Sequence, residues 1–272
     1  MEENITIVDR PGEFYCSGSE QVSAINIRCW RDHNPHGSQS LRQAFAGSCN
    51  PAFIQLGRRI GAETLYRYIQ AFGLFEKTNS NLYGESNSVF HKLSNVTEYE
   101  LATISFGQRF TITPLQLITA ASAIANEGVL MQPNIIKEIR NPNTGSITET
   151  VPVAVRQVLS KETADQLMEL LEYAVTDGTG GFSRVPGYSI GGKSGTSEPL
   201  ESNRNDGYVA SFIAVSPTTH AQVVILVVIY NPKGHSYQGG QVAAPVVSQI
   251  LSEVLPYLGI VSSQDSRKQC KS

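Results

Sequence analysis

The sequence predicts an α/β protein of the α+β type, in which an antiparallel sheet is flanked by helices. Three strand patterns follow one another at 188–195, 208–215 and 222–230, and turn-forming residues separate them. Short connections between consecutive strands favour antiparallel pairing. Amphipathic helical patterns come both before and after this block, so we expect helices to cover the sheet.

Helical periodicity begins at Ser38 and continues in three pieces. The first piece breaks at 47–50, the second covers 52–60 and the third covers 64–72. Gly61 is expected to end the second piece, because glycine commonly follows the last helical residue.

A long helix is expected to begin at Thr113-Pro114, with Thr as the cap and Pro in the first turn, and to stop at Gly128. Ser160 is expected to cap another helix that extends to Thr176, and 243–258 should form the last helix. Loop with a short hairpin is expected over 1–37, irregular structure over 76–96, and short strands with a turn over 132–157.

Length and charge limit the classes of function. A chain of 272 residues suits one large domain, which we expect over 1–260, with a polar C-terminal tail at 261–272. A net charge of −3 without a Lys/Arg cluster argues against a nucleic-acid partner. The longest apolar run, near 223–230, is far shorter than the roughly 20 residues of a membrane span. The polar start also lacks the pattern of a signal peptide, so we expect neither an anchor nor an export signal in this chain.

The cysteines leave three alternatives open. Four are too few for a disulfide scaffold in a chain of this length: Cys16, Cys29, Cys49 and Cys270. A hairpin could bring Cys16 and Cys29 together as a disulfide, or the two could remain unpaired thiols. A zinc site that adds His33 and His36 is the third alternative, although its spacing is looser than that of common zinc motifs.

Two short motifs carry chemically active side chains. Ser48-Cys49-Asn50 lies between two predicted helices, and Ser48 could simply cap the second of them. Lys193-Ser194-Gly195-Thr196 lies on a predicted strand after Gly191-Gly192, where the glycines allow a ligand or another backbone to come close. The second motif is the more specific one, although an exposed lysine on a strand would also explain it.

Together and in this order, the two motifs resemble the second and third signatures of the penicillin-recognising serine enzymes. The surrounding residues are similar to the transpeptidase domain of class B penicillin-binding proteins, and 16–30 is most similar to Gram-positive relatives of the sporulation type. The segments that carry the resemblance are Phe45-Ala46-Gly47-Ser48-Cys49-Asn50-Pro51-Ala52-Phe53, Ser105-Phe106-Gly107-Gln108, Thr113-Pro114-Leu115-Gln116-Leu117, Gly178-Thr179-Gly180, Val185-Pro186-Gly187-Tyr188 and Gly239-Gly240-Gln241-Val242-Ala243-Ala244-Pro245.

The resemblance implies acyl transfer on D-Ala-D-Ala wall peptides, with β-lactams as further ligands and no cofactor. Ser48 would relay a proton toward the leaving amine, Asn50 would hold the substrate amide, and Lys193 would supply positive charge to the substrate carboxylate. The hydroxyls of Ser194 and Thr196 would bind that carboxylate on either side of Gly195, and the Thr196 N–H would form half of the oxyanion hole.

The first signature of these enzymes is absent from the sequence. No serine is followed by lysine three residues later, so the catalytic serine and its lysine are not among the 272 residues. We therefore expect an N-terminally incomplete fold that is inactive alone. The alternatives are a non-catalytic remnant that binds wall peptide or a cell-wall-synthesis protein, and a split enzyme completed by an N-terminal chain. The family is membrane-anchored and extracytoplasmic, whereas the location of this chain stays unknown.

Three further expectations follow from the resemblance. The strand at 222–230 should become a sheet edge, because the family's first two strands, which pair beside it, are expected to be missing. Arg109 stands where the family usually has Gly, and Arg resists a positive φ if the turn requires one. The region holding Cys16 and Cys29 lies outside the cytoplasm in the family, where disulfides persist.

Overall fold

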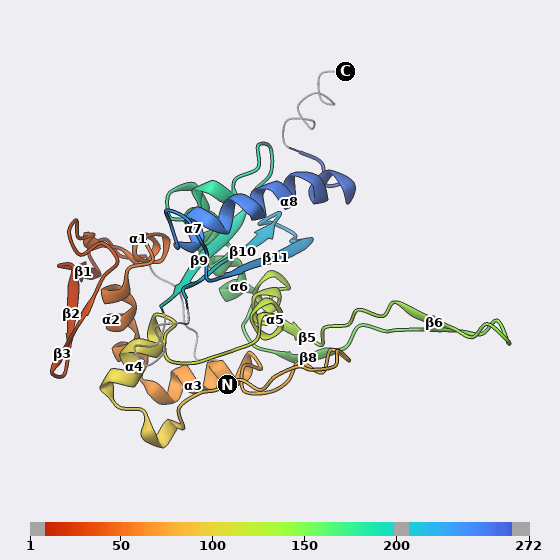
Figure 1. Cartoon of the computed structure of the whole chain (residues 1–272), viewed down its shortest axis with the longest axis horizontal. Coiled ribbons are helices and arrows are strands. Elements are labelled where there is room, and N and C mark those ends of the chain that lie inside the picture. The colour runs from red at the N-terminus through yellow and green to blue at the C-terminus, as the bar shows by residue number, and fades with distance from the viewer. Residues whose placement is uncertain (1–8, 199–206, 263–272) are drawn as a thin grey trace.

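A three-stranded antiparallel sheet forms the centre of the computed structural model, which describes residues 9–198 and 207–262 (Figure 1). Its strand order is β11-β10-β9, with β9 at Gly191–Ser197, β10 at Val209–Ser216 and β11 at Val223–Tyr230. All three predicted strands and their antiparallel pairing are confirmed, with ends that differ by at most three residues.

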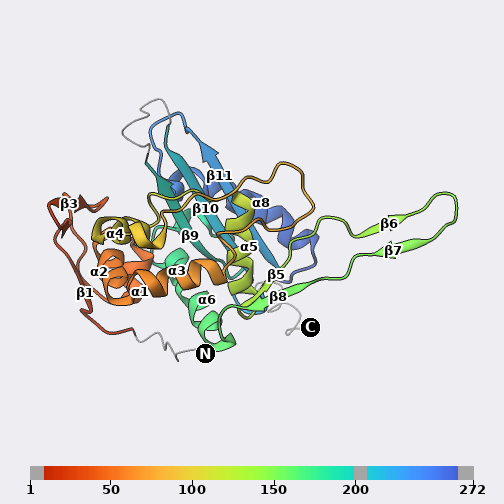
Figure 2. The ribbon, with the colours of Figure 1, turned by 90° about the horizontal axis from the view of Figure 1, so that it is seen from below.

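Helices cover both faces of this sheet (Figures 1 and 2). On one face lie α7 (Gly239–Val242) and α8 (Ala244–Tyr257), and on the other lie α5 (Pro114–Ala125) and α6 (Lys161–Thr176). The main core forms where the sheet meets α8, because alternate residues of β10 and the apolar side of α8 point toward each other. Its fully buried members include Phe212, Ala214, Val247, Leu251 and Leu255.

The strand β11 is an edge of the sheet, as predicted. Within the described part of the chain it pairs with β10 on one side and with no strand on the other. Its eight residues contain neither charge nor proline, and all except the last are half-buried. An edge of this composition has none of the usual protections against pairing with another chain.

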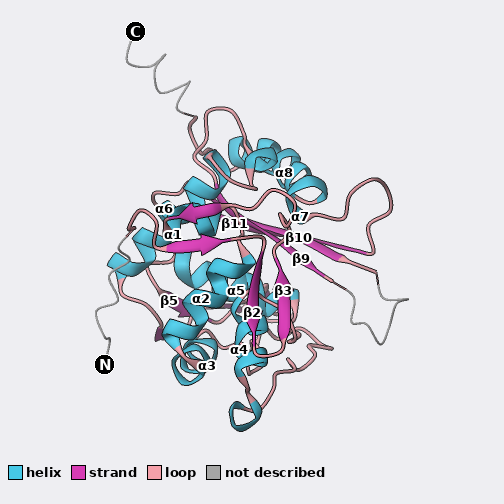
Figure 3. Ribbon diagram, turned by 90° about the vertical axis from the view of Figure 1, so that its left-hand side faces the viewer, coloured by secondary structure: helices cyan, strands magenta, loops and turns pink. Residues whose placement is uncertain are grey.

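The N-terminal region forms a smaller unit beside the sheet (Figure 3). Strand β1 (Phe14–Cys16) pairs with β4 (Gly37–Gln39), and β2 (Ser19–Val22) pairs with β3 (Ile25–Arg28). The β2–β3 pair is the short hairpin expected within 1–37, whereas the β1–β4 pairing was not predicted. The helices that pack nearby are α1 (Leu41–Ala46), α2 (Asn50–Ile60), α3 (Ala62–Ala71) and α4 (Glu98–Ser105).

Helix ends follow the predicted caps. Thr113 accepts a hydrogen bond from the backbone of Gln116 at the start of α5, and Ser160 accepts one from Thr163 at the start of α6. Gly61 ends α2 with a φ of 77°, as expected of glycine after a helix. The end of α5 is a small correction, because the helix stops at Ala125 rather than near Gly128.

A long hairpin extends away from the body (Figure 1). It begins where β5 (Val129–Met131) pairs with β8 (Ala154–Gln157), and β6 (Glu138–Arg140) pairs with β7 (Ile147–Glu149) further out. Two 3-10 helices, at Leu93–Asn95 and Gly181–Ser183, and an isolated antiparallel bridge between Val89 and Thr111 are also present. None of the described helices has the length and apolar character to cross a bilayer. The expected tail at 261–272 lies outside the described residues from 263 onward.

Candidate active site

Ser48 lies in the turn between α1 and α2 and has a left-handed backbone conformation, with a φ of 49°. The residue that caps α2 is Cys49, so the simpler alternative, in which Ser48 is the cap, is wrong. Pro51 occupies the first turn of α2 and fits there because that position needs no N–H donor. The turn therefore leaves the Ser48 hydroxyl available for contacts outside its own helix.

Lys193 reaches this hydroxyl from the central sheet. Its Nζ donates to Ser48 Oγ at 2.8 Å and to the carbonyl oxygen of Ser194 at 3.0 Å. The ring of Phe45 lies 5.9 Å from the same nitrogen. Lys193 is surrounded by protein, and the loss of hydration lowers the pKa of its ammonium from 10.5 to about 8. At neutral pH the group remains mostly charged, and it donates its protons to both oxygens.

The serine that follows, Ser194, joins the sheet to a second loop. Its Oγ lies 2.9 Å from Oγ1 of Thr179, which belongs to the Gly178-Thr179-Gly180 turn after α6. The Thr179 N–H in turn donates to the carbonyl of Ala46 at 3.1 Å, at the end of α1. Thr179 thereby links the strand of Lys193 to the helix that precedes Ser48.

Thr196 is held by the first residue of α7 and by Gln108. Its Oγ1 accepts a hydrogen bond from the Gly239 N–H at 3.1 Å, and its carbonyl accepts one from Gln108 Nε2 at 3.4 Å. A Cβ at Gly239 would lie 2.2 Å from the Ser211 carbonyl oxygen and 2.3 Å from that of Gly195. Glycine is needed here because α7 approaches the backbone of β9 and β10 at this point.

Asn50 occupies the first turn of α2. Its Nδ2 donates to the carbonyl of Arg28 at 3.2 Å, so the side chain connects the Ser48 turn to the end of β3. The structure thus brings Ser48 and Lys193 into direct contact, with Ser194 and Thr196 continuing along the same strand. The contributions of Thr179 and Gln108 were not predicted, although both lie in segments that carry the family resemblance.

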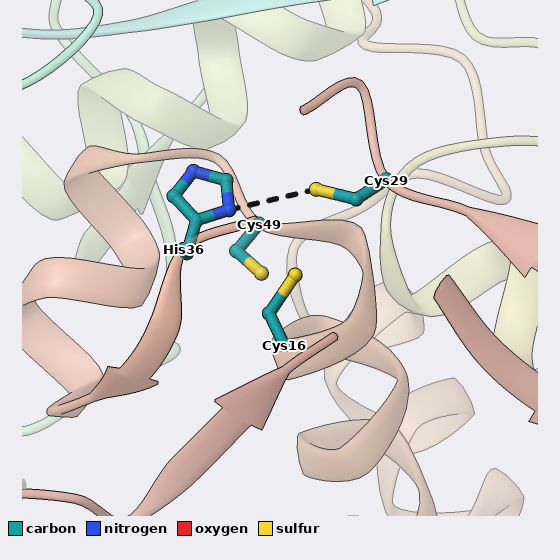
Figure 4. Close-up of side chains that lie close together, drawn as sticks. All are labelled: Cys16, Cys29, His36 and Cys49. Carbon is teal, nitrogen blue, oxygen red and sulfur yellow. Dashed lines mark hydrogen bonds between the residues drawn. The ribbon is translucent and has the colours of Figure 1, made fainter. Parts of the chain in front are cut away.

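Behind the Ser48 turn, three cysteines and one histidine converge (Figure 4). They are Cys16 at the end of β1, Cys29 just after β3, His36 just before β4 and Cys49 at the start of α2. Their ligand atoms all lie within 4.8 Å of one another. The Cys29 sulfur is 3.5 Å from His36 Nδ1, and Gln39 Nε2 donates to the Cys49 sulfur at 3.2 Å.

This cluster bears on the alternatives left open for the cysteines. Cys16 and Cys29 are free thiols in the structure, as in the alternative of unpaired thiols. The zinc alternative included His33 and omitted Cys49. The His33 side chain is 99% exposed and lies 3.6 Å from Asp32, whereas Cys49 is fully buried beside the other two thiols. Cys49 was overlooked because it lies inside the Ser48-Cys49-Asn50 motif, where the two neighbouring residues explained the segment.

Two of the thiols affect each other's acidity. A hydrogen bond from Cys49, together with one from His36, lowers the pKa of Cys29 to about 4 despite its burial. The same hydrogen bond and burial raise the pKa of Cys49. A first proton therefore leaves this pair of thiols more readily than it leaves an isolated cysteine.

The fold and the contacts agree with the comparisons with known proteins. The family model for the penicillin binding protein transpeptidase domain matches residues 7–252. The chain belongs to the penicillin-binding protein transpeptidase family. It is 39% identical over 251 residues to stage V sporulation protein D of Bacillus subtilis, which covers 91% of this chain and 39% of that protein. It is 33% identical over 216 residues to the peptidoglycan D,D-transpeptidase PbpA of Mycolicibacterium smegmatis, which covers 78% of this chain and 43% of PbpA.

Solved members of the family have the same fold. Penicillin binding protein 3 of Mycobacterium tuberculosis, in complex with ampicillin, superposes with a TM-score of 0.82 at 28% identity. That match covers 94% of this chain and 59% of the other. The chain thus spans about two fifths of the length of the curated relatives above and three fifths of this solved chain.

The turn at Arg109 requires the backbone conformation that glycine adopts easily. Gly107 has a φ of 91° and Arg109 a φ of 64°. Arg109 therefore takes the left-handed conformation that disfavours a residue with a Cβ. Its guanidinium lies 5.2 Å from the Tyr99 ring, a contact that offsets part of this cost.

Proposed function

We propose that this chain supplies the Ser-x-Asn and Lys-Ser-Gly-Thr parts of a peptidoglycan D,D-transpeptidase site, where D-Ala-D-Ala stem peptides and β-lactams bind. The observation that carries the proposal is the 2.8 Å hydrogen bond from Lys193 Nζ to Ser48 Oγ. This hydrogen bond brings together two motifs from distant segments. It places an ammonium beside a hydroxyl, a pair that can relay the proton that acyl transfer needs. The names of relatives, which include peptidoglycan D,D-transpeptidases, support the same class of reaction.

The direction of that hydrogen bond assigns a role to Ser48. Because the Lys193 ammonium donates to Ser48 Oγ, the hydroxyl hydrogen of Ser48 is free to point toward a bound substrate. When a nucleophilic serine attacks the D-Ala-D-Ala carbonyl, the C–N bond of the collapsing intermediate breaks and the leaving amine needs a proton. Ser48 donates that proton and is resupplied through Lys193.

The remaining residues of the strand suit a carboxylate. The hydroxyls of Ser194 and Thr196 lie along β9 beside the positive charge of Lys193, a combination that binds the C-terminal carboxylate of a stem peptide. The Thr196 N–H supplies one donor for the oxyanion of the intermediate. The acyl group then passes from the nucleophilic serine to an amine of a second stem peptide.

The nucleophile must come from outside these 272 residues, because no serine among them is followed by lysine three positions later. A second candidate function rests on the same fact. A chain with a carboxylate site and without the nucleophile could act as a binding module for wall peptide or for a cell-wall-synthesis protein. A fusion that adds the missing Ser-x-x-Lys segment distinguishes the two functions.

The experiment fuses this chain behind the segment that precedes the matching region in stage V sporulation protein D. Covalent labelling by fluorescent penicillin is then followed on a denaturing gel. We expect labelling that requires both the added Ser-x-x-Lys serine and Lys193. The Lys193→Met fusion serves as the control, and its folding is checked by circular dichroism. A folded fusion that stays unlabelled would reject the transpeptidase role and favour the binding module.

A further inference from the structure

The four converging side chains come from four separate segments of the chain (Figure 4). They are Cys16, Cys29, His36 and Cys49, whose ligand atoms lie within 4.8 Å of one another. In tetrahedral zinc sites, Zn–S bonds of about 2.3 Å and Zn–N bonds of about 2.0 Å place neighbouring ligand atoms roughly 3.5–3.8 Å apart. Side-chain movements of about 1 Å or less would therefore close this group around one ion.

The donor set and its burial favour a structural metal. The three cysteines are almost completely buried, and they pack with the apolar residues Phe14, Ala44 and Ala52. Three sulfurs and one imidazole nitrogen are ligands that select zinc over calcium or magnesium, which prefer oxygen. Four protein ligands leave no position open for water, which distinguishes structural zinc sites from catalytic ones.

Polar neighbours already orient two of the four ligands. Gln39, itself buried, donates its amide to the Cys49 sulfur at 3.2 Å, which stabilises a thiolate at that position. The Trp30 ring packs edge-on against the His36 ring with centroids 5.8 Å apart. Nδ1 of His36 faces the sulfurs, whereas the buried Nε2 has no hydrogen-bond partner among the described residues. The imidazole is thus held with its Nδ1 directed at the thiols.

We propose that Cys16, Cys29, His36 and Cys49 bind one zinc ion in a closed tetrahedral site. When zinc binds, the three cysteines are thiolates and the histidine is a neutral imidazole. The displaced thiol protons pass to solvent. The ion would tie β1, the end of β3 and the start of β4 to the first residue before α2.

The position of Cys49 gives this metal a consequence for the proposed active site. Cys49 stands between Ser48 and Asn50, so a metal bond to its sulfur fixes the turn that presents the Ser48 hydroxyl to Lys193. Ser48 holds a left-handed conformation that the surrounding structure must impose. The zinc ion acts as a positioning element for the Ser48 turn and takes no part in the chemistry.

Metal content tests the site without relying on penicillin labelling, so its result is independent of the proposed function. The full 272-residue chain is purified with a non-thiol reductant, loaded with zinc and dialysed, and zinc is measured by elemental mass spectrometry. We expect one zinc per chain for the wild type and at most a tenth of that for Cys49→Ser and Cys16→Ser. The matched controls His33→Ala and Cys270→Ser should keep one zinc, because neither residue belongs to the proposed ligand set.

Two measurements on the wild type guard against variants that fail to fold. Cobalt loading should give the intense sulfur-to-cobalt charge-transfer bands and the visible bands of a tetrahedral site, and zinc should abolish them. Alkylation followed by peptide mass spectrometry should show Cys16, Cys29 and Cys49 protected when zinc is bound and modified after chelation. A folded wild type that retains less than a tenth of an equivalent of zinc would overturn the proposal. Full zinc content in Cys49→Ser, or a disulfide between two of these cysteines in the loaded protein, would also overturn it.

Discussion

The Nζ atom of Lys193 donates a 2.8 Å hydrogen bond to the Oγ atom of Ser48, which lies 145 positions earlier in the chain. One partner lies in a strained turn and the other on β9, an edge strand of the three-stranded sheet, so the contact exists only when the sheet and the N-terminal helices are docked. The site is therefore a property of the tertiary fold, and its integrity reports on how the two parts of the chain pack.

The burial of Lys193 predicts a dependence of stability on pH. The folded-state pKa of about 8 lies below the unfolded value near 10.5, so the unfolded chain holds this proton more tightly. The free-energy cost of keeping the Lys193 ammonium charged in the folded protein is fully present below pH 8. This cost disappears as the pH rises toward 10.5. We expect the free energy of unfolding of the wild type, relative to Lys193→Met, to rise by at most about 3 kcal/mol across this window. Chemical denaturation at several pH values measures it, and a constant difference would contradict the lowered pKa.

The close approach of α7 to the sheet predicts that Gly239→Ala is destabilising. An added methyl group would meet the backbone oxygens of Ser211 and Gly195 at 2.2 and 2.3 Å, and backbone atoms cannot move aside easily. We expect a loss of about 1–3 kcal/mol in the free energy of unfolding. Gly181→Ala is the matched control, since the nearest atom to its Cβ, the Val175 carbonyl oxygen, is 3.9 Å away. Equal losses in the two variants would show that α7 does not pack as described.

The left-handed conformation of Arg109 predicts that Arg109→Gly stabilises the fold. Glycine removes the steric cost of the φ of 64°, a gain of about 1 kcal/mol after the loss of the Tyr99 contact. Arg109→Ala separates the two effects, because it keeps the Cβ and removes the guanidinium. Thermal melts should therefore rank glycine above both arginine and alanine. If glycine and alanine prove equally stable, the turn does not impose a positive φ at this position.

The unprotected edge of β11 predicts that the chain associates when expressed alone. Its half-buried apolar side chains and unpaired backbone groups invite another strand or a partner protein. Light scattering after size-exclusion chromatography should show a size that increases with concentration. A monodisperse monomer with a sharp cooperative melt would instead show that this edge is adequately covered.

The strands and most helices could be predicted because they depend on local pattern. The strand patterns at 208–215 and 222–230 and the caps Thr113 and Ser160 are local signals, and each appears in the structure where expected. Helix α4 was not predicted, because its buried residues do not follow a clear one-sided spacing. The Thr97 and Glu100 pair at its start is a capping box, and this was the signal that could have revealed it.

The site was predictable where motif residues carry it and unpredictable where distant contacts do. Ser48 and Lys193 were paired through the family resemblance, since no local pattern joins residues so far apart. The convergence of Cys49 with Cys16 and Cys29 depends on how α2 packs against the β1–β4 pair, and sequence spacing does not encode that packing.

Reaction of the isolated 272-residue chain with fluorescent penicillin tests the central claim most directly. Under the proposed function the site would bind and polarise a β-lactam, but these residues include no Ser-x-x-Lys nucleophile, so we predict no labelled band on a denaturing gel for the wild type or for Ser48→Ala. The fusion to the segment with Ser-x-x-Lys, run on the same gel, is the positive control. A wild-type band that disappears in Ser48→Ala would contradict the account, because Ser48 would then be the nucleophile rather than the residue that relays the proton.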